Sequence, residues 1–241
     1  MVAIRAIAPR ESVTMRRSQW FFLALVLAMF AVIAFVEGPR FFLVGFYRPP
    51  DFSSEIVIHI HVAIVAAWMF VLLAQVALRR VGWVAWHRRV GLASAALALL
   101  MLVFGLLATA DMLRREPEAL HRSIVPTTQI LMFALFAELA FVRRADREAH
   151  RRLIVLAMVD PLFGVLVPVT HRYLYAVERW ASFSWVILLL LAGYDLWTRR
   201  RLHPVTVWGS LLLIAVQEAR VPLGNTAAWT AIAAWMRSWG V

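Results

Sequence analysis

The sequence predicts an all-α polytopic membrane protein with seven transmembrane helices. Hydrophobic residues make up 63% of the 241 residues. Apolar runs long enough to cross a bilayer, which takes about 20 residues, recur along the chain. These runs lack the polar face that a helix of a water-soluble protein shows once per turn. We therefore expect a single transmembrane domain, residues 1–241, with spans 2–5 forming a core four-helix bundle.

The net charge of +11 indicates orientation in the membrane and not nucleic-acid binding. All the basic residues are arginines, and most lie in segments that face the cytoplasm if the N-terminus does, which is the positive-inside bias. We expect a bacterial inner (plasma) membrane, with the N-terminus cytoplasmic and the C-terminus outside. The lipid bilayer is then the expected partner. The absence of cysteine excludes disulfides, thiolate metal sites and covalently attached c-type haem.

The spans follow from the apolar runs taken in order. A cytoplasmic segment, 1–19, carries four arginines, and the run after it ends in FVEGPRFF without a small-residue cleavage site, which predicts an uncleaved first span. The C-terminal segment 226–239 places four large apolar side chains on one helical face, which predicts an interfacial helix. The expected spans cover residues 20–36, 56–78, 90–110, 123–142, 153–171, 180–197 and 205–223.

A pattern of histidine and arginine recurs along the chain. His61 is followed by Arg79 and by the His-Arg-Arg at 87–89, and His121 is followed by Arg143 and by the His-Arg-Arg at 150–152. Each unit is a helical hairpin that enters and leaves on the same side of the membrane. The sequence leaves open whether the pattern is a duplication or a result of arginine-rich cytoplasmic turns.

The expected topology sorts these histidines into two layers. His61 and His121 lie at the outer ends of spans 2 and 4, and His87 and His150 at the inner ends of spans 3 and 5. Two facing imidazoles in a helical bundle can hold a haem b by its iron, so these four residues are the candidate haem ligands. His59 and His61 point about 200° apart on a helix, and the deeper His61 is the one expected to face the bundle.

The motifs that contain these histidines resemble two groups of membrane proteins. One histidine on each of four consecutive helices is similar to the ascorbate-reducible transmembrane di-haem cytochromes b. HIH at 59–61, WHRRVG at 86–91 and HRRL at 150–153 more closely resemble a widespread bacterial family of uncharacterised multi-pass membrane proteins, over residues 56–240. The first resemblance implies haem b and electron exchange with a quinone or a redox partner. The second implies no established activity.

Two other interpretations of the histidines stay open. A zinc or iron site of His61, His121 and His171, with Asp111 or Glu118, would suit a membrane hydrolase, although the metalloprotease spacing HExxH is absent. A His-Arg-Arg sequence at an inner helix end can also simply anchor a span among anionic headgroups.

Asp160 is the clearest intramembrane signal, because it lies near the middle of span 5. An ionisable group at that depth costs a few kcal/mol, faces the bundle interior and indicates a functional site. Pro161 removes a backbone donor there, which favours a polar pocket shared with Gln129 or Thr128. Glu138 is the other polar residue expected within a span. The alternative is a protonated Asp160 bonded to a backbone carbonyl.

Three functions therefore follow from the sequence. The first is a b-type haem electron carrier or quinone-linked redox subunit, and the second is a proton-coupled transporter component that works through Asp160. The third is a partner-binding or structural membrane protein with no chemistry of its own. Glu218 and Arg220 either form an ion pair inside span 7 or mark its outer end. Substrate and oligomeric state stay undefined.

Overall fold

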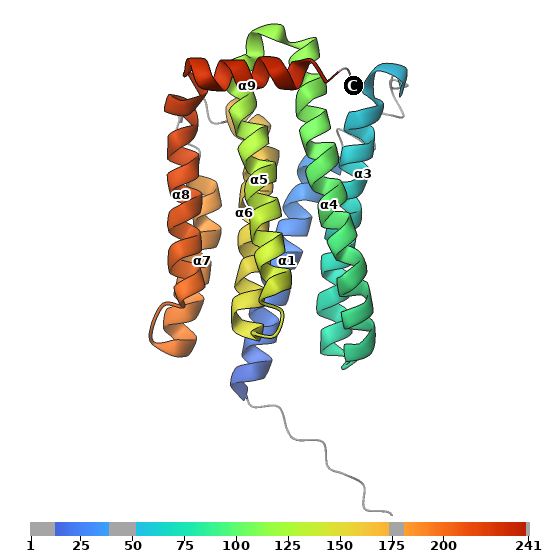
Figure 1. Ribbon diagram of the computed structural model, residues 1–241. Coiled ribbons are helices and arrows are strands. Elements are labelled where there is room, and N and C mark those ends of the chain that lie inside the picture. Colours follow the sequence, from blue (N-terminus) through green and yellow to red (C-terminus); the bar gives the residue numbers. More distant parts are fainter. Residues whose placement is uncertain (1–12, 39–51, 174–180, 240–241) are drawn as a thin grey trace, which may run out of the picture.

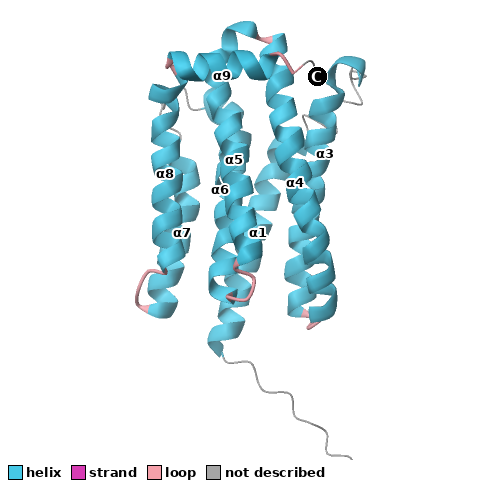
Figure 2. Cartoon of the chain, viewed as in Figure 1, coloured by secondary structure: helices cyan, strands magenta, loops and turns pink. Residues whose placement is uncertain are grey.

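The computed structural model describes residues 13–38, 52–173 and 181–239, with side chains over 19–35, 56–162 and 185–239. Within these ranges the chain consists of helices and short turns and contains no strand (Figure 2). Each expected span falls largely on one helix, and the expected C-terminal helix is α9. The helices are α1 (Val13–Gly38), α3 (Phe52–Arg80), α4 (Val84–Arg115), η2 (Pro117–Ser123), α5 (Ile124–Val142), α6 (Arg147–Tyr173), α7 (Ala181–Arg199), α8 (Pro204–Gly224) and α9 (Ala227–Arg237).

The long helices run lengthwise beside one another, and α9 lies across one end of the bundle together with η2 (Figure 1). We call this end the α9 end. The turns that join α3 to α4, α5 to α6 and α7 to α8 lie at the opposite end, which we call the arginine end. Twelve arginines lie at these turns: Arg79, Arg80, Arg88, Arg89, Arg143, Arg144, Arg147, Arg151, Arg152, Arg199, Arg200 and Arg201.

Among the residues that the structure describes, three helical segments are long and apolar enough to cross a membrane: Ile56–Arg80, Val84–Arg115 and Pro117–Val142. Only 22% of the most apolar window of each of the first two is buried inside the protein. Large apolar side chains such as Leu92 and Leu99 are 78% and 61% exposed. Apolar surface of this extent is untenable in water and natural against lipid. The chain is therefore an all-helical membrane protein.

The bundle is centred on α6, which packs against α1, α5, α7 and α8. Leu153, Leu156 and Val159 have no exposed surface, as expected of the uninterrupted apolar run at 153–159 within this helix. From α3, Trp68 reaches this centre and donates its indole N–H to the sulfur of Met158 at 3.2 Å. A separate four-helix core of α3 to α6 stays a prediction, because the buried face of α6 is shared with helices outside that unit.

Polar side chains cap the helices that carry the site. Asp146 accepts hydrogen bonds from the backbone N–H groups of Glu148 and Ala149 at the start of α6. His203 caps α8 by accepting from the N–H of Val205 at 3.1 Å. Both caps satisfy N–H groups that have no partner within the helix. They fix where α6 and α8 begin at the arginine end.

Candidate functional site

Asp160 lies in a buried ion pair with Arg220, which joins α6 to α8. Their side chains are 0% and 5% exposed, and Arg220 Nη2 donates to Asp160 Oδ2 at 2.7 Å. The other carboxylate oxygen accepts from the amide of Gln217 at 2.7 Å. The helix continues through Pro161 without interruption. A buried charge of either sign is tolerated when it is paired and hydrogen-bonded in this way.

Two neighbouring helices complete this network. Arg220 Nε donates to the hydroxyl of Thr128 on α5 at 2.8 Å, and that hydroxyl donates in turn to the carbonyl of Ile124 at 2.7 Å. The indole N–H of Trp185 on α7 donates to Gln217 Oε1 at 3.1 Å. One ion pair thus connects α5, α6, α7 and α8, and we call these groups the Asp160 network.

A second buried ion pair lies near the arginine end. Arg152 of α6 and Asp195 of α7 have no exposed side-chain surface, and Nε and Nη2 of Arg152 both donate to Asp195 Oδ1. Asp195 Oδ2 accepts from the backbone N–H of His203 at 2.9 Å and from the hydroxyl of Thr206 at 2.6 Å. Arg152 Nη1 also donates to Glu148. We call these groups the Asp195 network.

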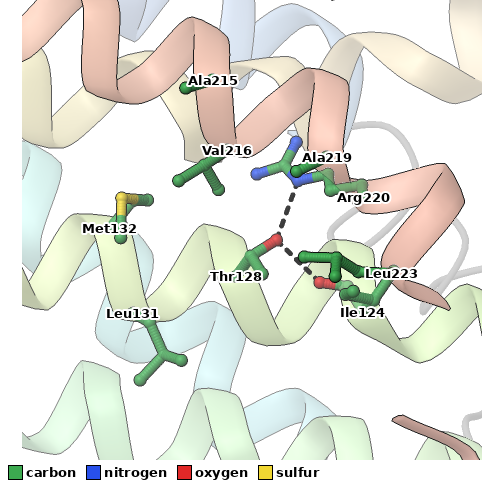
Figure 3. A pocket seen from close by; sticks show the side chains of 9 residues that line it. All are labelled: Ile124, Thr128, Leu131, Met132, Ala215, Val216, Ala219, Arg220 and Leu223. Atoms are coloured by element: carbon green, nitrogen blue, oxygen red, sulfur yellow. Dashed lines mark hydrogen bonds between the residues drawn. The ribbon is translucent and has the colours of Figure 1, made fainter. Parts of the chain in front are cut away.

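Two cavities adjoin the Asp160 network at the α9 end. The larger, of about 290 Å³, lies between α5 and α8 (Figure 3). The smaller, of about 120 Å³, lies between η2, α5 and α8. Ile124 and Arg220 line both cavities, so the buried guanidinium is placed where a ligand could approach it. The larger cavity is lined by Ile124, Thr128, Leu131, Met132, Ala215, Val216, Ala219, Arg220 and Leu223.

The outer-layer histidines lie on different faces of the bundle. His61 is partly buried between α3, α4 and α5. A Cβ added to Gly105 on α4 would lie 3.3 Å from Cε1 of His61 and 2.6 Å from the side chain of Ile130 on α5, so the three helices are close together here. His121 is exposed on η2 and lines the smaller cavity, whose walls come from η2, α5, α8 and the turn after α8. His61 is not among those walls. Ligation of one iron by both therefore stays a prediction.

The inner-layer histidines both lie at the arginine end. His87 at the start of α4 and His150 at the start of α6 are close enough for their charges to interact. His150 Nδ1 lies 2.8 Å from the carbonyl oxygen of Ala140. The Nδ1 atom of His87 is buried without a hydrogen-bond partner among the described residues, as are both amide atoms of Gln75. A backbone carbonyl at Nδ1 is the arrangement that leaves Nε2 of a histidine available for a metal.

The remaining predicted residues, Glu138, Gln129 and His171, lie in different surroundings. Glu138 is exposed on α5, whereas Gln129 is partly buried and its Nε2 has no partner among the described residues. The side chain of His171 lies outside the described residues, so the metal site with His61 and His121 stays a prediction. Within the described part of the chain, no three His, Asp or Glu side chains form a group that could hold a metal ion.

Sequence reasoning identified Asp160 but not its partners. Glu218 was the partner considered for Arg220, and the structure pairs Arg220 with Asp160, 60 residues away. Thr128 was expected beside Asp160 and joins it through Arg220. Asp195 and Gln217 were missed, although an acidic residue late in the apolar run of α7 and a polar Gln-Glu-Ala-Arg in α8 were visible signals.

Comparison with known proteins adds no further assignment. No family model, no curated protein and no solved structure matches the chain significantly.

Proposed function

We propose that this protein is a proton-coupled membrane transport component whose centre is the Asp160–Arg220 ion pair. In this proposal seven helices, α1 and α3 to α8, cross the inner membrane, with the arginine end in the cytoplasm and α9 on the outer surface. The arginine-rich turns support that orientation through the positive-inside bias. The observation that carries the proposal is an ion pair that is buried among apolar helices and whose arginine lines two cavities.

The chemistry of the pair suits movement of a proton together with an anion. While Asp160 is ionised, it neutralises Arg220 at 2.7 Å. A proton on Asp160 removes the negative charge of this carboxylate, and a buried guanidinium is then stabilised by an incoming anion. Loss of the proton restores the pair and releases the anion. One proton and one negative charge would thus move together, with Gln217 and Thr128 holding the two side chains in place.

Proton entry into vesicles tests this function. The purified full chain is reconstituted with a pH-sensitive dye inside and the membrane potential clamped, and inorganic phosphate or hexyl phosphate is added outside at lower pH. We expect one of these anions to speed proton entry over protein-free vesicles, and Asp160→Asn to abolish the effect. Glu138→Gln is the matched control, because this carboxylate is on α5 but exposed, and it should leave the rate unchanged.

Two results would overturn the transport proposal. One is a wild-type rate equal to that of protein-free vesicles with both anions, and the other is full activity of Asp160→Asn. Because loss of one charge can destabilise the fold, the double variant Asp160→Asn/Arg220→Gln is measured too. It should remain monodisperse in detergent and still fail to move protons.

Haem-based electron transfer is the second candidate function, favoured by the buried Nδ1 atoms of His61 and His87 and by the proximity of His87 to His150. A haem b held between His87 and His150 would supply one-electron chemistry with a quinone or a redox partner. The chain's own contribution is the orientation of His150 by the carbonyl of Ala140. The outer pair, His61 with His121, belongs to the same proposal.

An absorption spectrum tests the haem proposal. Protein purified from cells supplied with a haem precursor should show a Soret band, which His87→Ala should reduce. His59→Ala serves as the control, since His59 is not a proposed ligand. A colourless wild-type protein would exclude this function.

A further inference from the structure

The two cavities beside Arg220 are adjoining parts of one cleft. They share Ile124 and Arg220 as walls. The smaller cavity lies among η2, α5 and the end of α8, and the larger lies beside it between α5 and α8, where Figure 3 shows its walls. Gly224 is required at the end of α8, since a Cβ there would lie 2.6 Å from the carbonyl oxygen of His121. We call the whole feature the α5–α8 cleft.

The mouth of the α5–α8 cleft carries side chains with hydrogen-bond donors. His121, Arg122, Arg220 and Asn225 line the smaller cavity, and its walls include no acidic side chain from the part of the chain that the structure describes. Arg122 pairs with Glu116 at 3.2 Å, but both side chains are more than half exposed. An exposed pair of this kind is worth little, so Arg122 can turn to another anion. Arginine is well suited to bind a phosphate group with two parallel hydrogen bonds.

The inner part of the cleft is apolar and opens sideways. Its walls include Met132, Ala215 and Val216, and Leu131 and Leu223 at its edges are 44% and 53% exposed. Its volume of about 290 Å³ is close to the lower limit of small-molecule sites, roughly 300 Å³. A flexible hydrocarbon chain entering from the side matches this shape.

We propose that the α5–α8 cleft binds an anionic phospholipid of the surrounding membrane. Its phosphate lies against Arg122, His121 and Asn225 at the α9 end, and one acyl chain follows the groove between α5 and α8. Charge complementarity at the mouth selects an anionic over a zwitterionic headgroup, and the apolar walls hold the chain. Binding of this lipid does not depend on proton-coupled transport.

Photochemical labelling in nanodiscs tests the site. The full chain is placed in phosphatidylcholine nanodiscs containing phosphatidylglycerol with a diazirine in one acyl chain, and labelled residues are mapped by mass spectrometry. We expect labels concentrated on the α5 and α8 peptides that contain Met132, Ala215 and Val216. Unlabelled phosphatidylglycerol should compete, and added unlabelled phosphatidylcholine should not. Equal competition by both lipids, or labels spread evenly over all helices, would overturn the proposal.

Three variants separate the two parts of the cleft. Arg122→Gln should weaken competition by phosphatidylglycerol about tenfold, which corresponds to the loss of one charge-assisted hydrogen bond. Ala219→Trp fills the larger cavity and should abolish labelling of its walls. Arg237→Gln, on α9 at the same end, is the matched control and should change neither. Full labelling of both Arg122→Gln and Ala219→Trp would overturn the proposal.

The result is distinguishable from a failure of the transport proposal. Asp160→Asn changes neither Arg122 nor the apolar walls of the groove, so lipid labelling should persist while proton entry is lost. Proton entry without selective labelling would refute the lipid site alone.

Discussion

The Asp160 network and the Asp195 network use the same kind of ion pair in different surroundings. Asp195 accepts hydrogen bonds from Arg152, from the backbone of His203 and from Thr206. Neither Arg152 nor Asp195 lines the two cavities. Asp160 accepts from Arg220 and Gln217, and Arg220 lines both cavities. The first pair is enclosed by its own chain, whereas the second is adjacent to space that a ligand can enter.

This difference assigns the two pairs different roles. The Arg152–Asp195 ion pair holds the turn between α7 and α8 onto α6, and fixed groups of the chain donate to its carboxylate oxygens. Breaking this ion pair leaves several buried groups without partners. A buried pair beside a cavity can exchange one partner for a ligand. We therefore interpret the Asp195 network as structural and the Asp160 network as functional.

The largest expected effect is at Asp195. Asp195→Ala leaves Arg152 buried with only the partly exposed Glu148 as its counter-charge, and it removes the acceptor of the His203 N–H and the Thr206 hydroxyl. The free energy of unfolding should therefore fall by about 3–5 kcal/mol. Thermal unfolding in detergent, followed by tryptophan fluorescence, measures the change. Glu138→Gln is the control and should lie within about 0.5 kcal/mol of wild type. A loss at Asp195 no greater than this control would contradict the structural role.

Replacing each pair by apolar residues sharpens the comparison. Asp160→Leu/Arg220→Met removes the carboxylate oxygen that accepts a hydrogen bond from the amide of Gln217. The hydroxyl of Thr128 still donates to the carbonyl of Ile124. This double variant should lose about 1–3 kcal/mol.

The corresponding variant at the other network should lose more. Arg152→Met/Asp195→Leu removes the acceptor of both the His203 N–H and the Thr206 hydroxyl, and each costs about 1–3 kcal/mol. The same fluorescence-monitored unfolding compares the two doubles. A greater loss for the Asp160–Arg220 double would reverse the assignment of roles.

Removal of one hydroxyl from each network is a finer test. Thr206→Val deletes a fully buried donor to Asp195 at 2.6 Å and should cost about 1–2 kcal/mol. Thr128→Val deletes an acceptor for Arg220 on a half-buried side chain and should cost less. Proton entry should fall more in Thr128→Val than in Thr206→Val, because Thr128, and not Thr206, contacts Arg220. Equal effects of both substitutions on proton entry would speak against this distinction.

The smallest expected effect is a pH dependence at His203. Burial, together with the nearby charge of Arg152, lowers the pKa of His203 below its ordinary value of 6.5. The folded state therefore binds this proton less readily than the unfolded state, so stability is highest above about pH 6.5 and falls as the pH drops through the lowered folded pKa. Protonation also removes the ring acceptor that caps α8.

Unfolding temperature measured between pH 7.5 and 5 tests this dependence. His203→Asn keeps a capping oxygen, which is a favourable N-cap, but cannot titrate in this range. Its unfolding temperature should therefore depend less on pH than that of wild type. Identical profiles for the two proteins would assign the pH dependence to other groups.

Asp160 could be found from sequence because a carboxylate within an apolar run stands out locally. Its partner could not be found in the same way. Arg220 lies two positions after Glu218, so the sequence suggested either a pair with that near neighbour or a span end, and gave no sign of an aspartate 60 residues away. Asp195 and Arg152 lie near helix ends, where charged residues are ordinary at a membrane surface. Only the return of α8 alongside α7 encloses them.

The sequence by itself determined that the chain is a helical membrane protein, where its helices run, and that arginine gathers at one end, because hydrophobicity and charge are properties of local segments. Tertiary structure alone decided which buried charges meet, that α6 is the central helix, and that Arg220 faces a cleft. Each of these depends on contacts between helices distant in the chain, which no local pattern encodes.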